Sequence, residues 1–122
     1  MTQISVKPIV GIGSSLNDLK EFPEDVHDIM GYALYLAQKG GKHQSAKPLK
    51  GFGGAKVLEI TDDYDGDTYR AVYTVKFADT VYVLHAFQKK SKKGIATPQQ
   101  DIKLIQERLK RAQEHYEKFK SK

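Results

Sequence analysis

The sequence has no cysteine, only four prolines and no long apolar run. The absence of cysteine excludes disulfide scaffolds, thiolate zinc sites and cysteine nucleophiles. No segment approaches the roughly 18–20 apolar residues of a membrane-spanning helix, and the N-terminus lacks the cationic start and apolar core of a secretory signal. The 122 residues, 39% hydrophobic and 29% charged, therefore predict one small cytoplasmic domain that folds by packing alone.

Basic charge is concentrated in the last third of the chain. Residues 1–79 carry 9 basic and 11 acidic side chains, a net charge of −2, whereas residues 80–122 carry 11 basic and 4 acidic ones, a net charge of +7. A strongly basic C-terminal third suits a polyanion bound to one surface. A solvated lysine-rich helix produces the same imbalance, so charge alone leaves both interpretations open.

The N-terminal half predicts one short strand and two helices. The β-branched segment Ile4–Val10 indicates an edge strand, because its proline cannot donate to a sheet. Ser15 and Asp18 have capping-box spacing and predict a short helix. Pro23 suits the first position of a second, longer helix, which ends at Gly40. The apolar stripe of this second helix comprises Val26, Ile29, Met30, Ala33, Leu34 and Ala37.

Beyond a glycine-rich segment at 40–54, expected to be a mobile loop, the hydrophobic period changes to two. Three antiparallel strands are predicted, at 56–60, 68–77 and 80–88, with Asp65 and Gly66 forming the first hairpin turn. Thr97 as N-cap and Pro98 then begin a C-terminal helix over 97–120. Its stripe comprises Ile102, Ile105, Leu109, Ala112, Tyr116 and Phe119 and is typical of a helix docked on its own domain or of a coiled-coil seam.

The predicted fold is therefore a single α+β domain spanning residues 1–122, with an N-terminal strand, two helices, a three-stranded antiparallel meander and a C-terminal helix.

The sequence contains only incomplete versions of the motifs that bind phosphate or metal ions. The glycine turn at 11–15 lacks the lysine of a phosphate loop, and the acidic hairpin has Val72 where a calcium loop needs its closing glutamate. The four histidines show no metal-ligand spacing, so we expect no metal and no cofactor.

The remaining candidate site is a cluster of basic residues on two neighbouring strands. Arg70 lies in the middle of the second meander strand, on the face that also carries Lys76, while His85 and Lys89 share one face of the third. Arg70 either pairs with a carboxylate such as Glu59 on the adjacent strand or binds phosphate in an open groove. His85 is either a hydrogen-bonded core imidazole or an acid–base group.

These residues carry a family resemblance. The runs Tyr69–Tyr73 and Val81–Ser91, followed by Thr97-Pro98 and preceded by Lys47–Gly51, resemble the RelE/ParE toxin superfamily, most closely its HigB-like, phage-related branch, over about residues 8–115. The resemblance implies the toxin of a type II toxin–antitoxin pair. Such a toxin cleaves mRNA without a metal, often on the ribosome, and is silenced by a small helix-turn-helix, HigA-like antitoxin.

The resemblance implies Arg70, His85, Lys89, Lys90 and Lys56 as site residues, and the chemistry of RNA cleavage and the basic charge of the chain suggest their roles and the further contacts. Arg70 and Lys90 are expected to stabilise the phosphate under attack by the ribose 2′-hydroxyl, Lys89 to share this role or act as general acid, and His85 to be a reserve acid or base. Contacts to RNA or phosphate are expected from Lys56, Lys76, Lys92, Lys93, Lys103 and Arg111.

Two positions depart from the family pattern. Thr61 stands where members often carry an arginine after the strand glutamate, and 91–98 contains no tyrosine. These departures favour two alternatives to a nuclease. One is a toxin-fold protein acting on a protein target such as gyrase, and the other is an inactive relative that binds antitoxin or RNA.

Overall fold

The computed structural model describes residues 6–54, 56–90 and 97–120, without the side chains of Lys90 and Lys120. In chain order the elements are β1 (Ile9–Gly11), α1 (Ser15–Lys20), α2 (Glu24–Gln38), β2 (Ala46–Pro48), β3 (Val57–Tyr64), β4 (Asp67–Thr74), β5 (Val81–Lys90) and α3 (Gln99–Lys120). The α+β class is confirmed, and the predicted succession of one strand, two helices, three antiparallel strands and a C-terminal helix is confirmed apart from the additional strand β2. Among the described helices, none has the length and apolarity to cross a lipid bilayer.

One mixed five-stranded sheet, ordered β1-β5-β4-β3-β2, forms the centre of the molecule. β1 pairs in parallel with β5, and the other pairs are antiparallel. The hairpin prediction is confirmed, since Asp65 and Gly66 both have positive φ, at 52° and 84°. The prediction of a loop throughout 40–54 is wrong, because Ala46 pairs with Ile60 and is buried in the core, which adds β2 as an edge strand.

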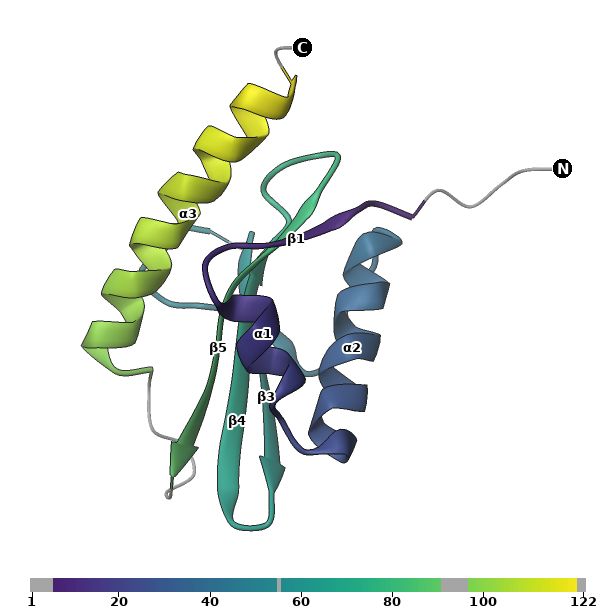
Figure 1. Ribbon diagram of the computed structural model, residues 1–122, viewed down its shortest axis with the longest axis vertical. Coiled ribbons are helices and arrows are strands. Elements are labelled where there is room, and N and C mark those ends of the chain that lie inside the picture. The colour runs from purple at the N-terminus through teal and green to yellow at the C-terminus, as the bar shows by residue number, and fades with distance from the viewer. Residues whose placement is uncertain (1–5, 55, 91–96, 121–122) are drawn as a thin grey trace, which may run out of the picture.

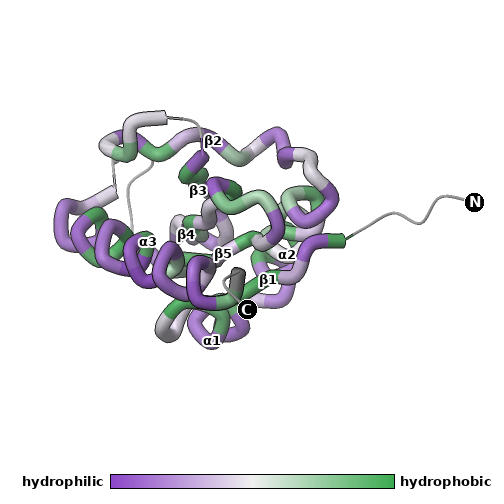
Figure 2. Tube along the Cα trace, turned by 90° about the horizontal axis from the view of Figure 1, so that it is seen from above, coloured by the Kyte–Doolittle hydropathy of each residue, from purple (hydrophilic) through white to green (hydrophobic). Residues whose placement is uncertain are grey.

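The helices form a layer on each side of the sheet, with α1 and α2 covering one face and α3 the other (Figure 1). Each face has its own apolar core: Met30 and Tyr73 belong to the first, and Ile105 and Tyr82 to the second. In Figure 2 the α3 tube is largely hydrophilic with hydrophobic residues at intervals, as expected of a helix docked on its own domain. Its predicted stripe extends too far, because Phe119 is 65% exposed.

The glycine turn between β1 and α1 is a packing site. Gly13 has a φ of +60°, and a Cβ there would lie 2.9 Å from Nη2 of Arg108. Arg108 is buried on α3 and donates from Nη1 to the carbonyl of Leu84 at 2.9 Å. The predicted Ser15 cap is wrong, because Ser14 is the N-cap and the buried Ser15 hydroxyl instead donates to the Val83 carbonyl. This turn therefore joins β1, α1, β5 and α3.

Candidate functional site

The candidate site lies on the face of the sheet that α3 covers. The register places Thr61, Arg70 and Phe87 opposite one another on three neighbouring strands, and Val72 opposite His85. Since directly paired residues of antiparallel strands project to the same face, Arg70, His85 and Phe87 lie on one face of the sheet. The sheet thus presents an arginine and an imidazole toward the first turns of α3.

Arg70 is bound to a carboxylate. Its Nη1 donates to Oε1 of Glu59 at 2.9 Å and to the Thr97 hydroxyl at 3.3 Å, and that hydroxyl donates to Oε2 of Glu59 at 2.6 Å. The side chains of Arg70 and Glu59 are only 8% and 12% exposed. Of the two expectations for Arg70, the ion pair with Glu59 is the one observed. The hydroxyl of Thr97 thus serves this triangle rather than a helix cap.

The same triangle forms part of the wall of a groove of about 730 Å³. Glu59, Thr61 and Arg70 provide its floor from β3 and β4. Pro48, Leu49, Lys50 and Gly51 line one side and Gln99, Ile102 and Gln106 of α3 the other, with Thr97 at the start of the helix. Arg70 is therefore largely buried and ion-paired, yet it borders a hollow large enough for a nucleotide.

His85 is turned away from this groove. Its Nε2 is 2.8 Å from Oδ1 of Asp101 on α3, and its ring stacks on Phe87 with centroids 4.6 Å apart. Its buried Nδ1 has no hydrogen-bond partner within the described part of the chain. Of the two expectations for His85, the core imidazole is observed.

Two lysines follow His85 along β5. Lys89 is partly buried and lies opposite Thr68, on the face that carries Arg70. Diagonal neighbours in such a pair have Cα atoms about 7–8 Å apart, so Lys89 and Arg70 are near enough to approach one phosphodiester. The backbone of Lys90 ends β5, but its side chain, like all of Lys92 and Lys93, lies outside the described residues.

The other predicted RNA contacts do not converge on the groove. Lys56 and Lys76 are exposed at the far end of the sheet from the hairpin. Lys76 is six positions after Arg70, a distance of roughly 20 Å along an extended strand. In addition, β4 ends at Thr74, before Lys76. Lys103 and Arg111 are exposed on α3. Only an extended RNA would reach these four side chains together with the groove.

Three polar groups of this site are missing from the predicted set of catalytic and RNA-binding residues. Glu59 was expected only as the partner of Arg70, although its carboxylate also lines the groove. Thr97 was predicted only as the N-cap of the last helix, and no role was predicted for Asp101. Both come within hydrogen-bond distance of the sheet because α3 crosses it at this end. The one sequence signal for Glu59 was a carboxylate inside an otherwise apolar strand.

One comparison with known proteins identifies a family. A family model described as phage-derived protein Gp49-like (DUF891) matches residues 17–110. No curated protein matches the sequence.

Among solved structures, a double arginine-to-alanine mutant of the Escherichia coli toxin RelE in the free state has a TM-score of 0.54 at 16% identity, covering 87% of this chain and 97% of that one. The isolated E. coli RelE toxin has a TM-score of 0.52 at 18% identity, covering 72% and 87%. The RelBE2 toxin–antitoxin complex from Mycobacterium tuberculosis has a TM-score of 0.44 at 16% identity, covering 73% and 98%. The family model covers more than half of the chain, so the chain belongs to the phage-derived Gp49-like family, and the two E. coli structures show that it has a RelE-like fold.

Proposed function

We propose that this protein is the toxin of a type II toxin–antitoxin pair and a metal-free endoribonuclease that cleaves mRNA in the groove beside Arg70. Family membership and the RelE-like fold support a toxin. The observation that carries the nuclease proposal is the adjacency of a guanidinium and a carboxylate in one groove wall, at 2.9 Å. RNA transesterification needs both an acceptor for a hydroxyl proton and a cation for the phosphorane.

Glu59 is the proposed general base. The Thr97 hydroxyl donates to its Oε2 at 2.6 Å, which is the hydrogen bond that an attacking ribose hydroxyl would make. When RNA enters, its 2′-hydroxyl replaces Thr97 at this oxygen. The 2′-oxygen then bonds to the adjacent phosphorus, its proton passes to Glu59, and the bond from phosphorus to the 5′-oxygen breaks, leaving a 2′,3′-cyclic phosphate.

Arg70 is the proposed stabiliser of the phosphorane and Lys89 the proposed general acid for the leaving 5′-oxygen. The guanidinium of Arg70 is already held at the groove by its bond to Glu59, so its N–H donors need little movement when negative charge develops on the phosphate oxygens. Lys89 lies on the same face, one diagonal step along the sheet. Lys90 remains a second phosphate ligand in this proposal, and His85 acts by holding Asp101 and thereby the first turn of α3.

The test is cleavage of a labelled RNA by purified protein in EDTA, together with growth and mRNA integrity after induction without an antitoxin. Arg70→Ala should lower the cleavage rate about 10²–10³-fold. Lys76→Ala is the matched control, since it removes one positive charge from an exposed position far from the groove. Circular dichroism must show that both variants fold, and Lys89→Ala provides a second loss of activity. Undisturbed growth and intact mRNA on expression of the wild type would refute the proposal.

A second candidate is favoured by the burial of Arg70 and its ion pair with Glu59. A guanidinium neutralised in this way is a weaker ligand for phosphate than a solvated one. The alternative is a RelE-fold toxin that binds a protein target through the same groove. Growth arrest with intact mRNA would select this alternative, because a protein target needs no RNA cleavage.

A further inference from the structure

The outer face of α2, which points away from the sheet, carries large apolar side chains that remain exposed (Figure 1). Ile29, Tyr32 and Tyr35 are 38%, 55% and 44% exposed and follow one side of the helix at spacings of three. Three large side chains on one helix face, two of them aromatic, form the kind of patch that marks a protein contact. We call this face, from Asp28 to Lys39, the α2 stripe.

The two ends of the α2 stripe carry opposite charges. Asp28 at the N-terminal end has a side chain that is 73% exposed and lies 4.0 Å from Nδ1 of His27. Lys39 at the C-terminal end is the C-cap of α2, and its Nζ lies 5.2 Å from the ring centroid of Tyr35. Asp28 and Lys39 are equally far in sequence from the midpoint between Tyr32 and Tyr35. The order negative, aromatic, aromatic, positive is therefore complementary to itself when it is reversed.

Gly31 gives an independent indication of a partner. Glycine in the middle of a helix is unfavourable relative to alanine, because it loses more backbone freedom on folding. Packing within the chain does not require it, since a Cβ at Gly31 would meet no described atom within 4 Å outside its own stretch of helix. Gly31 borders the α2 stripe, one turn before Tyr35. The missing side chain leaves room for another chain to come close to α2.

We propose that the α2 stripe is the interface of a symmetric homodimer, in which it packs antiparallel on the same stripe of a second copy. A two-fold axis at the midpoint places Tyr32 beside Tyr35 of the second copy and Asp28 beside Lys39 of the second copy, and symmetry makes each contact twice. Gly31 then makes room for the ring of Tyr35 of the second copy. Antiparallel packing also sets the positive end of each helix dipole beside the negative end of the other.

The charge order favours a second copy over other occupants, because a partner of one uniform charge would meet a like charge at one end of the stripe. The dimer leaves the groove free. Since α2 and α3 cover opposite faces of the sheet, the two grooves of the dimer face away from the interface (Figure 1). The proposal therefore stands whether or not the groove is a nuclease site. A single pair of helices buries a small area, so we expect a weak dimer with a Kd on the order of 10–100 μM.

The test is sedimentation equilibrium of the full chain at concentrations from about 1 μM to about 1 mM, over which the average mass should rise from that of one chain toward twice that value. Asp28→Lys and Lys39→Glu should each weaken the dimer about tenfold, since each turns two attractive contacts into repulsive ones. Both substitutions in one chain should restore the Kd to within about threefold of the wild type, because the exchanged charges again face their opposites. Tyr32→Ala should weaken the dimer at least about tenfold.

Glu114→Lys and Lys110→Glu are the matched controls, because they make the same charge reversals at exposed positions of α3, on the other face, and should leave the dimer unchanged. Circular dichroism must show that every variant folds. A wild-type chain that remains monomeric at about 1 mM would overturn the proposal and leave the α2 stripe to a different protein. A dimer that tolerates Tyr32→Ala, or that the double exchange fails to restore, would also overturn it. RNA cleavage by the Tyr32 variant is a separate readout and should match the wild type.

Discussion

The ion pair between Arg70 and Glu59 should be measurable as a coupling energy. Glu59→Ala removes both the 2.9 Å bond to Arg70 and the 2.6 Å bond from Thr97, and it leaves a guanidinium that is 8% exposed without this carboxylate. Removing one partner of a buried pair costs about 3–5 kcal/mol. With roughly 4 °C lost per kcal/mol in a domain of this size, the melting temperature should fall by about 12–20 °C.

The coupling itself requires a double-mutant cycle of Glu59→Ala, Arg70→Ala and the combination. The double variant should lose about 1.5–3 kcal/mol less free energy of unfolding than the two single variants lose together, which is the range for hydrogen bonds to charged groups. Urea unfolding followed by circular dichroism, with equal m-values across the set, gives the four free energies of unfolding.

The exposed pair Gln113 and Glu117, whose side chains are 3.2 Å apart on α3, is the reference cycle. Its coupling should stay below about 0.5 kcal/mol, because solvent competes for both groups. If the losses at Arg70 and Glu59 added to within about 0.5 kcal/mol, the buried ion pair would contribute nothing specific and our account of the groove wall would be refuted.

Three further predictions concern stability. Burial raises the pKa of Tyr73 to about 12, so the neutral hydroxyl contributes fully to the free energy of unfolding below pH 10, and this contribution is lost as the pH rises toward 12. The loss should be about 2–3 kcal/mol between pH 9 and pH 12, measured by unfolding at each pH, and Tyr73→Phe should remove it. Burial and Asp63 raise the pKa of Asp62, so Asp62→Asn should raise the melting temperature at pH 7 but not at pH 3. Gly13→Ala should lower the free energy of unfolding by about 1–3 kcal/mol, because φ is +60° and the added methyl group contacts Arg108. Gly66→Ala is the control, since Gly66 also has a positive φ but open space around it, and its loss therefore measures the backbone cost alone.

Much of the fold follows from local pattern. The alternation along β4 predicts correctly that Arg70 and Val72 share a face, and the Asp65-Gly66 turn fixes how β3 pairs with β4. β2 could not be predicted in the same way. Its three residues include Pro48 and show no period, and they become a strand only because β3 offers an edge to pair with.

The candidate site was predictable in its residues but only partly in its contacts. The strand period placed Arg70 with Lys76 and His85 with Lys89, each pair on one face of its own strand, and the cost of burying a charge led to Glu59 as a partner of Arg70. The partners on α3 were not accessible to this reasoning. The bond from Asp101 to His85 depends on where the helix crosses the sheet, which is a matter of tertiary packing.

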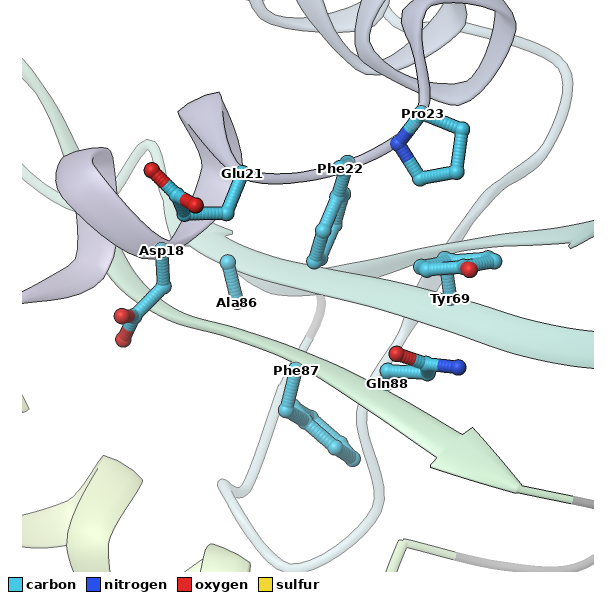
Figure 3. Close-up of a pocket in the computed structure, with 8 residues that line it drawn as sticks. All are labelled: Asp18, Glu21, Phe22, Pro23, Tyr69, Ala86, Phe87 and Gln88. Carbon is cyan, nitrogen blue, oxygen red and sulfur yellow. The ribbon is translucent and has the colours of Figure 1, made fainter.

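The two cavities follow from the same property of β4. Successive residues of a strand point to opposite faces, so Arg70 borders the groove under α3 while Tyr69, its neighbour in sequence, borders a cavity of about 450 Å³ that Asp18 and Glu21 also line (Figure 3). One surface joins a guanidinium to the start of a basic helix, and the other joins a tyrosine hydroxyl to carboxylates. A shift of one residue in the register of β4 would exchange these two side chains and abolish both surfaces at once. The pairing of β4 with β3 and β5 is therefore the structural condition for both cavities.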